Sequence, residues 1–341
     1  MGPLTGLKIL DFSTLLPGPY ATHLLNDMGA EVLRIVSPTR PDLMQAFPAI
    51  DHYLNDGKEQ RLLDLTQAEA KDQVRTLLAD YDILLEQFRP GVMARFGLGY
   101  DDLQADFPHL IYCSLTGYGQ TGPLKDRAGH DINYQALTGV ASYGGSDRPV
   151  LTATPVADLA GGSLHAVIAI LAAVNERHQT GLGQYLDVAM ADATLALNAM
   201  EAPRVLAGEP SPTPQSGWLN GGLFYDYYCC ADNLWLAVGG LEPKFIKALC
   251  EGLGKEDWVP RFMDLSPESQ SQLRSDLADH FATETREFWM ERLAGDCCVE
   301  PVLTLAEALQ HPQFLSRSMV DPESGRLGCA LQFPGSRLGL S

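Results

Sequence analysis

The residues of this sequence best suited to moving a proton are one histidine and two acidic side chains. His130 lies in the stretch GHDINY (Gly129–Tyr134), directly after a segment rich in glycine and proline. Asp158 precedes a long apolar run, and Glu242 follows a pair of glycines. An imidazole titrates near pH ~6.5 and suits a base at neutral pH, whereas an aspartate becomes a useful base only when burial raises its pKa. We therefore treat these three residues as candidates for acid–base chemistry.

Each candidate also has a purely structural interpretation. A lone histidine is more often structural than catalytic. Asp158 and Glu242 stand at the starts of predicted helices, where a carboxylate commonly caps the N-terminus or interacts with the helix dipole. For Asp158 the two interpretations are compatible, because a helix N-terminus also favours negative charge on a bound ligand. His130 is favoured by its neighbours, since a carboxylate, an amide and a phenol follow it within four residues.

A glycine pattern follows a predicted strand at Gly117, Gly119 and Gly122. It matches the GxGxxG pattern of dinucleotide-binding folds, but Pro123 and three charged residues stand where the helix of such a fold would begin. We therefore predict a loop in which the glycines let the chain bend close to a ligand or to neighbouring backbone.

The first 200 residues have the pattern of a scaffold that could position these side chains. Predicted strands are residues 7–12, 31–36, 83–88, 110–115 and 184–190, and predicted helices are 20–28, 67–79 and 158–174. Short and nearly all-apolar strands that alternate with helices indicate an α/β fold with a parallel sheet covered on both faces. The stretch GHDINY is predicted as a loop.

The composition changes after residue 200. A proline-rich segment follows, then a predicted hairpin of residues 223–228 and 234–238, then predicted helices at about 243–252, 266–282 and 285–294. We predict a large domain over residues 1–200, a linker over 201–222 and a smaller α+β domain over 223–300. The C-terminal segment 301–341 is predicted to return to the large domain.

Composition excludes several classes of protein. The chain has 341 residues, a net charge of −19 and 45% hydrophobic residues, so it is not disordered, and no basic stripe indicates a nucleic-acid partner. The longest apolar run, residues 166–174, is far shorter than the ~20 residues of a membrane span. The start lacks the pattern of a signal peptide, and the seven cysteines show no metal or disulfide spacing. We expect a cytoplasmic protein with neither a membrane nor a nucleic acid as partner.

Several stretches resemble the family III CoA-transferases and racemases (CaiB/BaiF type). They are residues 15–20 (LLPGPY), 30–35 (AEVLRI), 63–65 (LDL), 84–99 (LLEQFRPGVMARFGLG), 110–122 (LIYCSLTGYGQTG), 129–134 (GHDINY), 157–162 (ADLAGG), 238–245 (VGGLEPKF), 301–303 (PVL) and 311–314 (HPQF). GHDINY points to the α-methylacyl-CoA racemase branch, because transferases that resemble this chain usually lack that histidine.

The resemblance implies a catalytic pair, His130 and Asp158, with Glu242 supporting the histidine from the second domain. The residues that it implies along the CoA and acyl path are Leu63, Asp64, Leu65, Thr66, Arg95, Gly129, Asp131, Ile132, Asn133 and Tyr134. The implied fold is a Rossmann-like, CoA-binding large domain with a smaller domain, in two chains interlocked as a homodimer. No metal and no cofactor is implied, since CoA arrives as part of the acyl-CoA thioester.

Three departures from the family pattern bear on CoA binding. Ser37 stands where the family usually has an arginine, so that Arg34 or Arg40 would have to substitute. Thr66 stands where a lysine is common. The sequence ends at Ser341 without the C-terminal helical extension common in the family.

The reaction that the resemblance implies is racemisation at the α-carbon of 2-methylacyl-CoA thioesters. Two bases on opposite faces would remove and return the proton through an enolate, with N–H groups at the helix start after Asp158 stabilising the negative charge. Two alternatives stay open, as does the natural acyl chain. One is a CoA-transferase in which Asp158 forms an acyl anhydride, and the other is a non-catalytic acyl-CoA binding protein.

Overall fold

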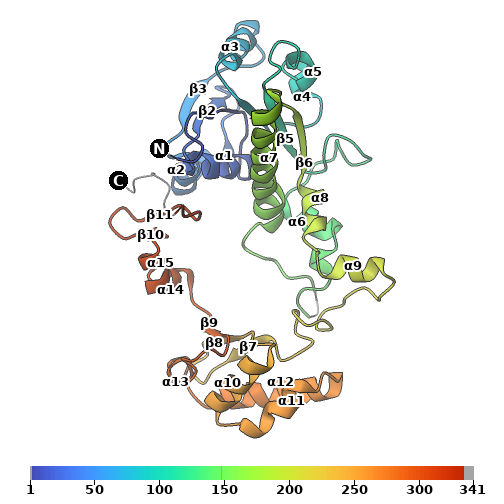
Figure 1. Ribbon diagram of the computed structural model, residues 1–341, viewed down its shortest axis with the longest axis vertical. Coiled ribbons are helices and arrows are strands. Elements are labelled where there is room, and N and C mark those ends of the chain that lie inside the picture. The colour runs from blue at the N-terminus through green and yellow to red at the C-terminus, as the bar shows by residue number, and fades with distance from the viewer. Residues whose placement is uncertain (1, 147, 334–341) are drawn as a thin grey trace. The chain divides into compact units, whose positions relative to one another are not determined.

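The computed structural model describes residues 2–146 and 148–333, which fold into two compact units (Figure 1). The first unit comprises the described residues of Met1–Val140, Leu151–Ala199 and Leu315–Ser341. The second unit comprises those of Ala141–Val150 and Met200–Phe314.

The first unit is built on a six-stranded parallel sheet with the strand order β3-β2-β1-β4-β5-β6. The strands are β1 (Lys8–Asp11), β2 (Glu31–Val36), β3 (Glu59–Leu62), β4 (Ile83–Glu86), β5 (Ile111–Thr116) and β6 (Tyr185–Ala189). This confirms the predicted α/β class and its parallel sheet. The order is that of doubly wound folds, in which the direction of winding reverses between β1 and β4 and ligands bind beyond the carboxyl ends of the strands there.

Helices connect these strands and a short hairpin follows them. The helices are α1 (Pro17–Asp27), α2 (Pro48–Asn55), α3 (Ala68–Leu78), α4 (Val92–Arg95), α5 (Tyr100–Leu103), α6 (Asp131–Leu137), a π-helix (Ala157–Leu164), α7 (His165–Thr180) and α8 (Met190–Ala196), with 3₁₀ turns at Leu43–Ala46 and Val140–Ser142. The hairpin strands are β10 (Val320–Asp321) and β11 (Arg326–Leu327), preceded by α15 (Pro312–Ser316).

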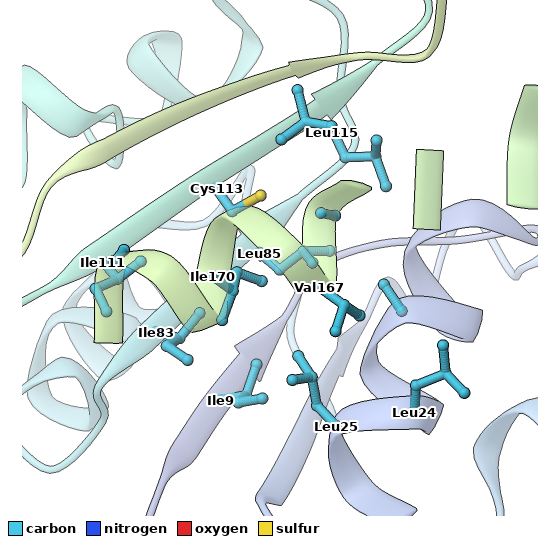
Figure 2. Packing of buried hydrophobic residues seen from close by; sticks show 14 of the residues in the cluster. Ile9, Leu24, Leu25, Ile83, Leu85, Ile111, Cys113, Leu115, Val167 and Ile170 are labelled. Atoms are coloured by element: carbon cyan, nitrogen blue, oxygen red, sulfur yellow. The ribbon is translucent and has the colours of Figure 1, made fainter. Parts of the chain in front are cut away.

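Alternate strand residues face two separate hydrophobic cores. On one face Ile9, Leu85 and Cys113 pack with Leu25 of α1 and Val167 of α7 (Figure 2). The core on the other face includes Leu10, Leu33, Val74, Leu78, Leu84 and Tyr112. Each fully buried aliphatic side chain contributes roughly 1.5–3 kcal/mol, so the two cores fix the sheet that positions the carboxyl-end loops.

The π-helix and α7 form one helical run, Ala157–Thr180, of 24 residues. By length and composition alone this run could cross a membrane, which the apolar stretch 166–174 did not indicate. A helix that is apolar all round also suits a protein core or an interface. Because α7 contacts α1, β5 and β6 through buried residues such as Val167 and Ile170, we interpret the run as a core helix of the first unit.

The sequence predicted the five core strands and the helices α1, α3 and α7 to within a few residues. The exposed strand β3, the helix α2 and the short helices α4, α5 and α8 were missed. Helix α1 begins at Pro17, not at residue 19 or 20. The prediction of GHDINY as a loop is wrong in part, because α6 begins at Asp131 with His130 as its N-cap.

The second unit contains a three-stranded antiparallel sheet, in the order β7-β8-β9, and its own core. Its strands are β7 (Asp226–Cys229), β8 (Trp235–Val238) and β9 (Val299–Pro301), and its helices are α9 (Glu201–Leu206), α10 (Pro243–Leu253), α11 (Val259–Met263), α12 (Pro267–Phe281), α13 (Arg286–Arg292) and α14 (Leu305–Leu309), with a 3₁₀ turn at Glu256–Trp258. The predicted hairpin and its three helices are therefore confirmed.

The unit boundaries differ from the predicted ones at two places. The predicted linker 201–222 contains α9 and belongs to the second unit. The chain returns to the first unit at Leu315, later than the predicted residue 301. Arg286 keeps the stretch after residue 301 on the second unit, because its guanidinium donates to the carbonyl of Val302 (2.8 Å) and to Glu307 (2.9 Å). Residues 334–341 of the predicted C-terminal segment lie outside the described residues.

Candidate functional site

The loop between β1 and α1 lies at the carboxyl ends of the strands, at the point between β1 and β4 where the winding reverses. Asp11 accepts hydrogen bonds from the Ser13 amide (2.8 Å) and from Thr22 Oγ1 (2.5 Å). The Gly18 amide donates to Gln87 Oε1 (3.0 Å), which joins this loop to the segment after β4. The two strands at the reversal therefore carry loops that are held together before any ligand binds.

His130 stands at the start of α6 with its imidazole exposed. Its backbone amide donates to Asn133 Oδ1 (3.0 Å), so the Asn133 side chain holds the turn that presents the imidazole. Ile132, in the same turn, is 54% exposed and makes an apolar surface beside it. This arrangement leaves the His130 ring accessible to a substrate.

Asp158 is the second residue of the π-helix, a rare helix type that is frequent at functional sites. Val156 is the N-cap, so the interpretation of Asp158 as an N-capping residue is wrong. The turn is fixed at its far end, because His165 Nδ1 lies 2.6 Å from the Ala160 carbonyl oxygen and Ser163 Oγ donates to the Pro17 carbonyl (2.6 Å). Within the described residues we find no hydrogen bond to the Asp158 carboxylate, which is half-buried.

A glycine lets this π-helix approach α8 closely. A Cβ at Gly161 would lie 2.4 Å from Thr194 Oγ1 and 2.9 Å from the Met190 carbonyl oxygen. Only a residue without a side chain fits there, so the ADLAGG stretch has a packing reason as well as a chemical one.

Asp131 connects the two candidate bases. Its Oδ1 accepts hydrogen bonds from the amides of Ala157 (2.7 Å) and Asp158 (3.1 Å). Its Oδ2 accepts from Gln135 Nε2 (2.5 Å). The residue next to His130 therefore holds the backbone of Asp158, and the structure brings these two predicted catalytic residues into one corner. We call His130, Asp131 and Asp158 the acid–base corner.

The electrostatics of this corner favour a partly protonated Asp158. The pKa of Asp158 is raised to about 6, mainly by burial and also by the negative charge of Asp131, while the nearby His130 acts to lower it. Burial likewise raises the pKa of Tyr134 well above its usual range, with a further contribution from Asp158, so its phenol stays neutral. An aspartate with a pKa near neutrality can both accept and return a proton.

The glycine pattern at 117–122 is part of this corner and not a dinucleotide fingerprint. The chain after β5 bends without a helix until α6. A Cβ at Gly117 would lie 2.4 Å from the Tyr134 hydroxyl oxygen, and that hydroxyl donates to the Gly129 carbonyl (2.7 Å). The glycine therefore makes room for a side chain of GHDINY, where we had predicted a close approach to ligand or backbone.

One predicted role does not fit the geometry. We expected N–H groups after Asp158 to stabilise an enolate, but the Leu159 amide donates to the Pro155 carbonyl (3.0 Å). The amides of Ala157 and Asp158 are bonded to Asp131. These groups are therefore already engaged within the protein.

A comparison with known sequences decides the family. The sequence pattern described as CoA-transferase family III matches residues 4–335. The chain belongs to this family. Human α-methylacyl-CoA racemase is 37% identical over 314 residues, which cover 90% of this chain and 80% of the racemase. A succinyl-CoA:mesaconate CoA-transferase of Haloarcula hispanica is 33% identical over 340 residues, covering 94% of this chain and 85% of the transferase.

The fold agrees with solved structures of the same family. A CaiB/BaiF family protein from Brucella suis superposes with a TM-score of 0.84 at 28% identity and covers 98% of this chain and 93% of that one. Family membership makes the chain an enzyme of the CoA-transferase III type with acyl-CoA as its substrate class.

Four of the remaining residues expected along the CoA path, Leu63–Thr66, directly follow β3. The side chains of Leu63 and Leu65 are buried in a hydrophobic core, so their place along the CoA path stays a prediction. Asp64 Oδ1 accepts from the Thr66 amide (3.0 Å) and hydroxyl (2.7 Å), and these bonds, with the nearby Arg40, lower the Asp64 pKa. We call Ser37, Arg40, Asp64 and Thr66 the outer edge.

The structure distinguishes the two arginines considered as substitutes for the family arginine at Ser37. Arg34 is 4% exposed and lies 3.7 Å from Asp42, so it cannot serve a surface phosphate. Arg40 is exposed. Arg95, at the end of α4, is exposed as well.

Glu242, the N-cap of α10, is exposed on the second unit, so its role beside His130 stays a prediction.

One buried carboxylate at the carboxyl ends of the strands was not identified from the sequence. Glu86, the last residue of β4, accepts from the Ser114 hydroxyl and from the Phe88 amide (2.7 Å), and burial raises its pKa to about 7. It lines a cavity of about 470 Å³ together with Arg89 and Tyr185. The sequence signal that could have identified Glu86 is a single glutamate at the end of the apolar run ILLE.

Two further residues support the acid–base corner. Asn133 and Gln135 lie within one turn of His130 and Asp131, respectively.

Proposed function

We propose that this enzyme racemises the α-carbon of 2-methylacyl-CoA thioesters by a two-base proton transfer. The observation that carries the proposal is the acid–base corner. An exposed imidazole and a half-buried carboxylate with a pKa of about 6 are supplied by two helices that Asp131 joins.

The reaction needs a base on each face of the α-carbon. In one direction His130 takes the α-proton, the C–H electron pair forms the enolate, and protonated Asp158 gives its proton to the opposite face. In the other direction the roles exchange. General-base groups of this kind contribute typically 10²–10⁴-fold each. The His130 imidazolium that forms in the first step also offsets the enolate's negative charge, a role that the bonded amides near Asp158 cannot take.

A family III CoA-transferase is the second candidate. Transferases are nearly as similar to this chain as racemases, and a carboxylate without hydrogen-bond partners, as Asp158 is among the described residues, suits a nucleophile that forms an acyl anhydride. His130 has no part in that mechanism, and its placement beside Asp158 favours the racemase.

One experiment separates these candidates. The enzyme is incubated in deuterated water with one enantiomer of a 2-methylacyl-CoA, with and without an acceptor carboxylic acid. A racemase incorporates deuterium at the α-carbon without the acceptor and forms both enantiomers. A transferase instead moves CoA only when the acceptor is present, and a non-catalytic binding protein does neither. Acceptor-dependent transfer without α-deuteration would reject the racemase.

We also propose that two chains form a homodimer. The first unit exposes large apolar side chains on three helices, namely Ile132 and Leu137 on α6, Leu164 and Ile168 on the helical run Ala157–Thr180, and Leu195 on α8. α6, the π-helix and α8 contact one another, so we infer that these side chains form one surface that a second copy of the chain would cover. Glu242 of the partner subunit would then support His130, as the family resemblance implies.

Co-expression of two inactive variants tests the shared site. His130→Ala and Glu242→Ala chains carrying different tags would form mixed dimers with one intact site, so purified mixed dimers should regain about half of the wild-type activity. If each site were built from one chain, the mixed dimers would stay inactive. Light scattering that shows an active monomer would reject the dimer altogether.

A further inference from the structure

Asp131 is the residue of GHDINY whose side chain hydrogen-bonds the helix that carries Asp158. Both carboxylate oxygens are engaged inside the protein, Oδ1 by the amides of Ala157 and Asp158 and Oδ2 by Gln135. The resemblance had placed Asp131 along the CoA path. Its hydrogen bonds direct it to the acid–base corner instead.

We infer that Asp131 is a positioning residue that fixes Asp158 against His130, and that it does so without touching the substrate. The inference rests on the proposed role of Asp158 as a base. Two adjacent amides at the start of the π-helix share one acceptor oxygen, so the carboxylate sets where that helix begins and which way its second residue faces. Because His130 directly precedes Asp131, the same carboxylate sets the separation of the two bases.

The charge of Asp131 adds an electrostatic effect to this geometry. The charged groups that act on Asp158 both come from α6, with Asp131 raising its pKa and His130 lowering it. Tyr134 of α6 faces it as a neutral phenol. The α1 and α8 atoms closest to Gly161 and Gly162 belong to Pro17, Met190 and Thr194, none of which titrates. On the helical run itself, His165 is bonded to the Ala160 carbonyl.

Two substitutions separate the hydrogen bonds from the charge. Asp131→Asn keeps an acceptor oxygen for the two amides and a partner for Gln135, which can rotate its amide, but removes the charge. Asp131→Ala removes both. Asp192→Asn, at an exposed aspartate of α8, is the matched control for loss of one carboxylate nearby.

The first readout does not depend on activity. Protein labelled with ¹³C at the aspartate carboxyl carbons is titrated by NMR, and the Asp158 signal is assigned by its loss in Asp158→Asn. Asp131→Asn should move the Asp158 titration to lower pH by roughly half to one unit, because a like charge has been removed. Asp192→Asn should leave it unmoved. An unmoved titration in Asp131→Asn would overturn the electrostatic part of the inference.

The second readout is α-proton exchange in deuterated water as a function of pH. In Asp131→Asn the acidic limb of exchange that uses ionised Asp158 should shift to lower pH by the same amount. Asp131→Ala should lower kcat about 10-fold or more with KM nearly unchanged, since the acyl-CoA contacts remain. A rise in KM with unchanged kcat would make Asp131 a substrate contact and reject the positioning role.

The two hypotheses fail in different ways. If wild-type enzyme shows no exchange, the proposed racemase is rejected, while the NMR titration still tests the link between Asp131 and Asp158. If Asp131→Ala does not fold, the variants Asp131→Asn and Gln135→Ala still test the inference. Gln135→Ala removes only the Oδ2 partner, so its loss of kcat should be smaller than that of Asp131→Ala. A full wild-type rate and an unmoved profile in both would overturn the inference.

Discussion

The acid–base corner and the outer edge lie beyond the carboxyl ends of the same sheet, but they are built differently. In the corner, Asp131 bonds to two amides of the π-helix, and Gly161 packs within van der Waals distance of α8. At the outer edge, Asp64 and Thr66 bond mainly to each other, and Arg40 is exposed. The chemistry is therefore attached to packed helices, whereas the region implied in CoA binding is a surface of short local turns.

This difference predicts which property of the enzyme a substitution in each region will change. Positions in the corner should affect the chemical step or the stability of the first unit, because their neighbours cannot move easily. Positions at the outer edge should affect binding alone, by amounts typical of exposed charges.

The largest expected effect is on racemisation when either base is removed. His130→Ala and Asp158→Asn should each lower the racemisation rate by about 10²–10⁴-fold, since the reaction needs both proton transfers. Each variant should retain some deuterium exchange with one enantiomer, the one whose proton faces the remaining base. The measurement is enantiomer-resolved exchange of a 2-methylacyl-CoA.

His178→Ala is the control, because His178 is exposed in the last turn of α7. It should leave the rate unchanged. Full racemisation by His130→Ala would remove the two-base mechanism, and equal loss with both enantiomers in both variants would show that the bases do not act on opposite faces.

A smaller effect is expected on stability when the packing of the corner is disturbed. Gly161→Ala places a Cβ 2.4 Å from Thr194 Oγ1, so either the π-helix or α8 must shift. Overpacking of this kind costs about 1–3 kcal/mol of unfolding free energy. Gly295→Ala is the matched control, since no atom lies within 4 Å of a Cβ there. Urea denaturation measures the unfolding free energy of both variants. Equal midpoints would show that the π-helix and α8 accommodate the extra methyl group without loss of stability.

The sequence could predict the parallel sheet because its strands are short apolar runs, and each core strand appears near its predicted place. It could not predict β3, since the four residues EQRL are all exposed and show no apolar pattern. His130, Asp158 and Glu242 were identifiable by type and by resemblance. The inward turn of Asp131 was not, because hydrogen bonds between residues 26 or 27 positions apart leave no local pattern.

The same limit applies to the outer edge. The stretch LDL was assigned to the CoA path as one piece, but the alternation of a strand end sends Leu63 and Leu65 into the core and leaves Asp64 and Thr66 outside. A motif locates a region, whereas the direction of each side chain follows from the sheet.

Removing a cation from the predicted CoA path should weaken acyl-CoA binding moderately. Arg95→Ala should weaken acyl-CoA binding about 10-fold, because a charge-assisted hydrogen bond to phosphate is worth roughly 1.5–3 kcal/mol. Arg204→Ala is the control, since Arg204 is already paired with Glu201 and Glu209 on the second unit. Calorimetry with a non-reactive acyl-CoA analogue measures the affinity. Unchanged binding would exclude Arg95 from the site.

The smallest expected effect comes from adding the cation that the family pattern has at Ser37. Ser37 Oγ accepts from the amides of Thr39 (3.3 Å) and Arg40 (3.2 Å), so Ser37→Arg loses two long hydrogen bonds of an exposed turn and gains a charge. Exposed charges interact by about 0–1 kcal/mol, which predicts acyl-CoA binding tighter by no more than about 5-fold. Ser37→Gln, of similar length but uncharged, separates the charge from the lost turn. The gain should shrink as salt rises from 0.05 to about 0.5 M, because the Debye length falls below the distance between surface charges. Equal affinities of the arginine and glutamine variants at low salt would show that CoA does not pass the end of β2, and the outer edge would then have no part in binding.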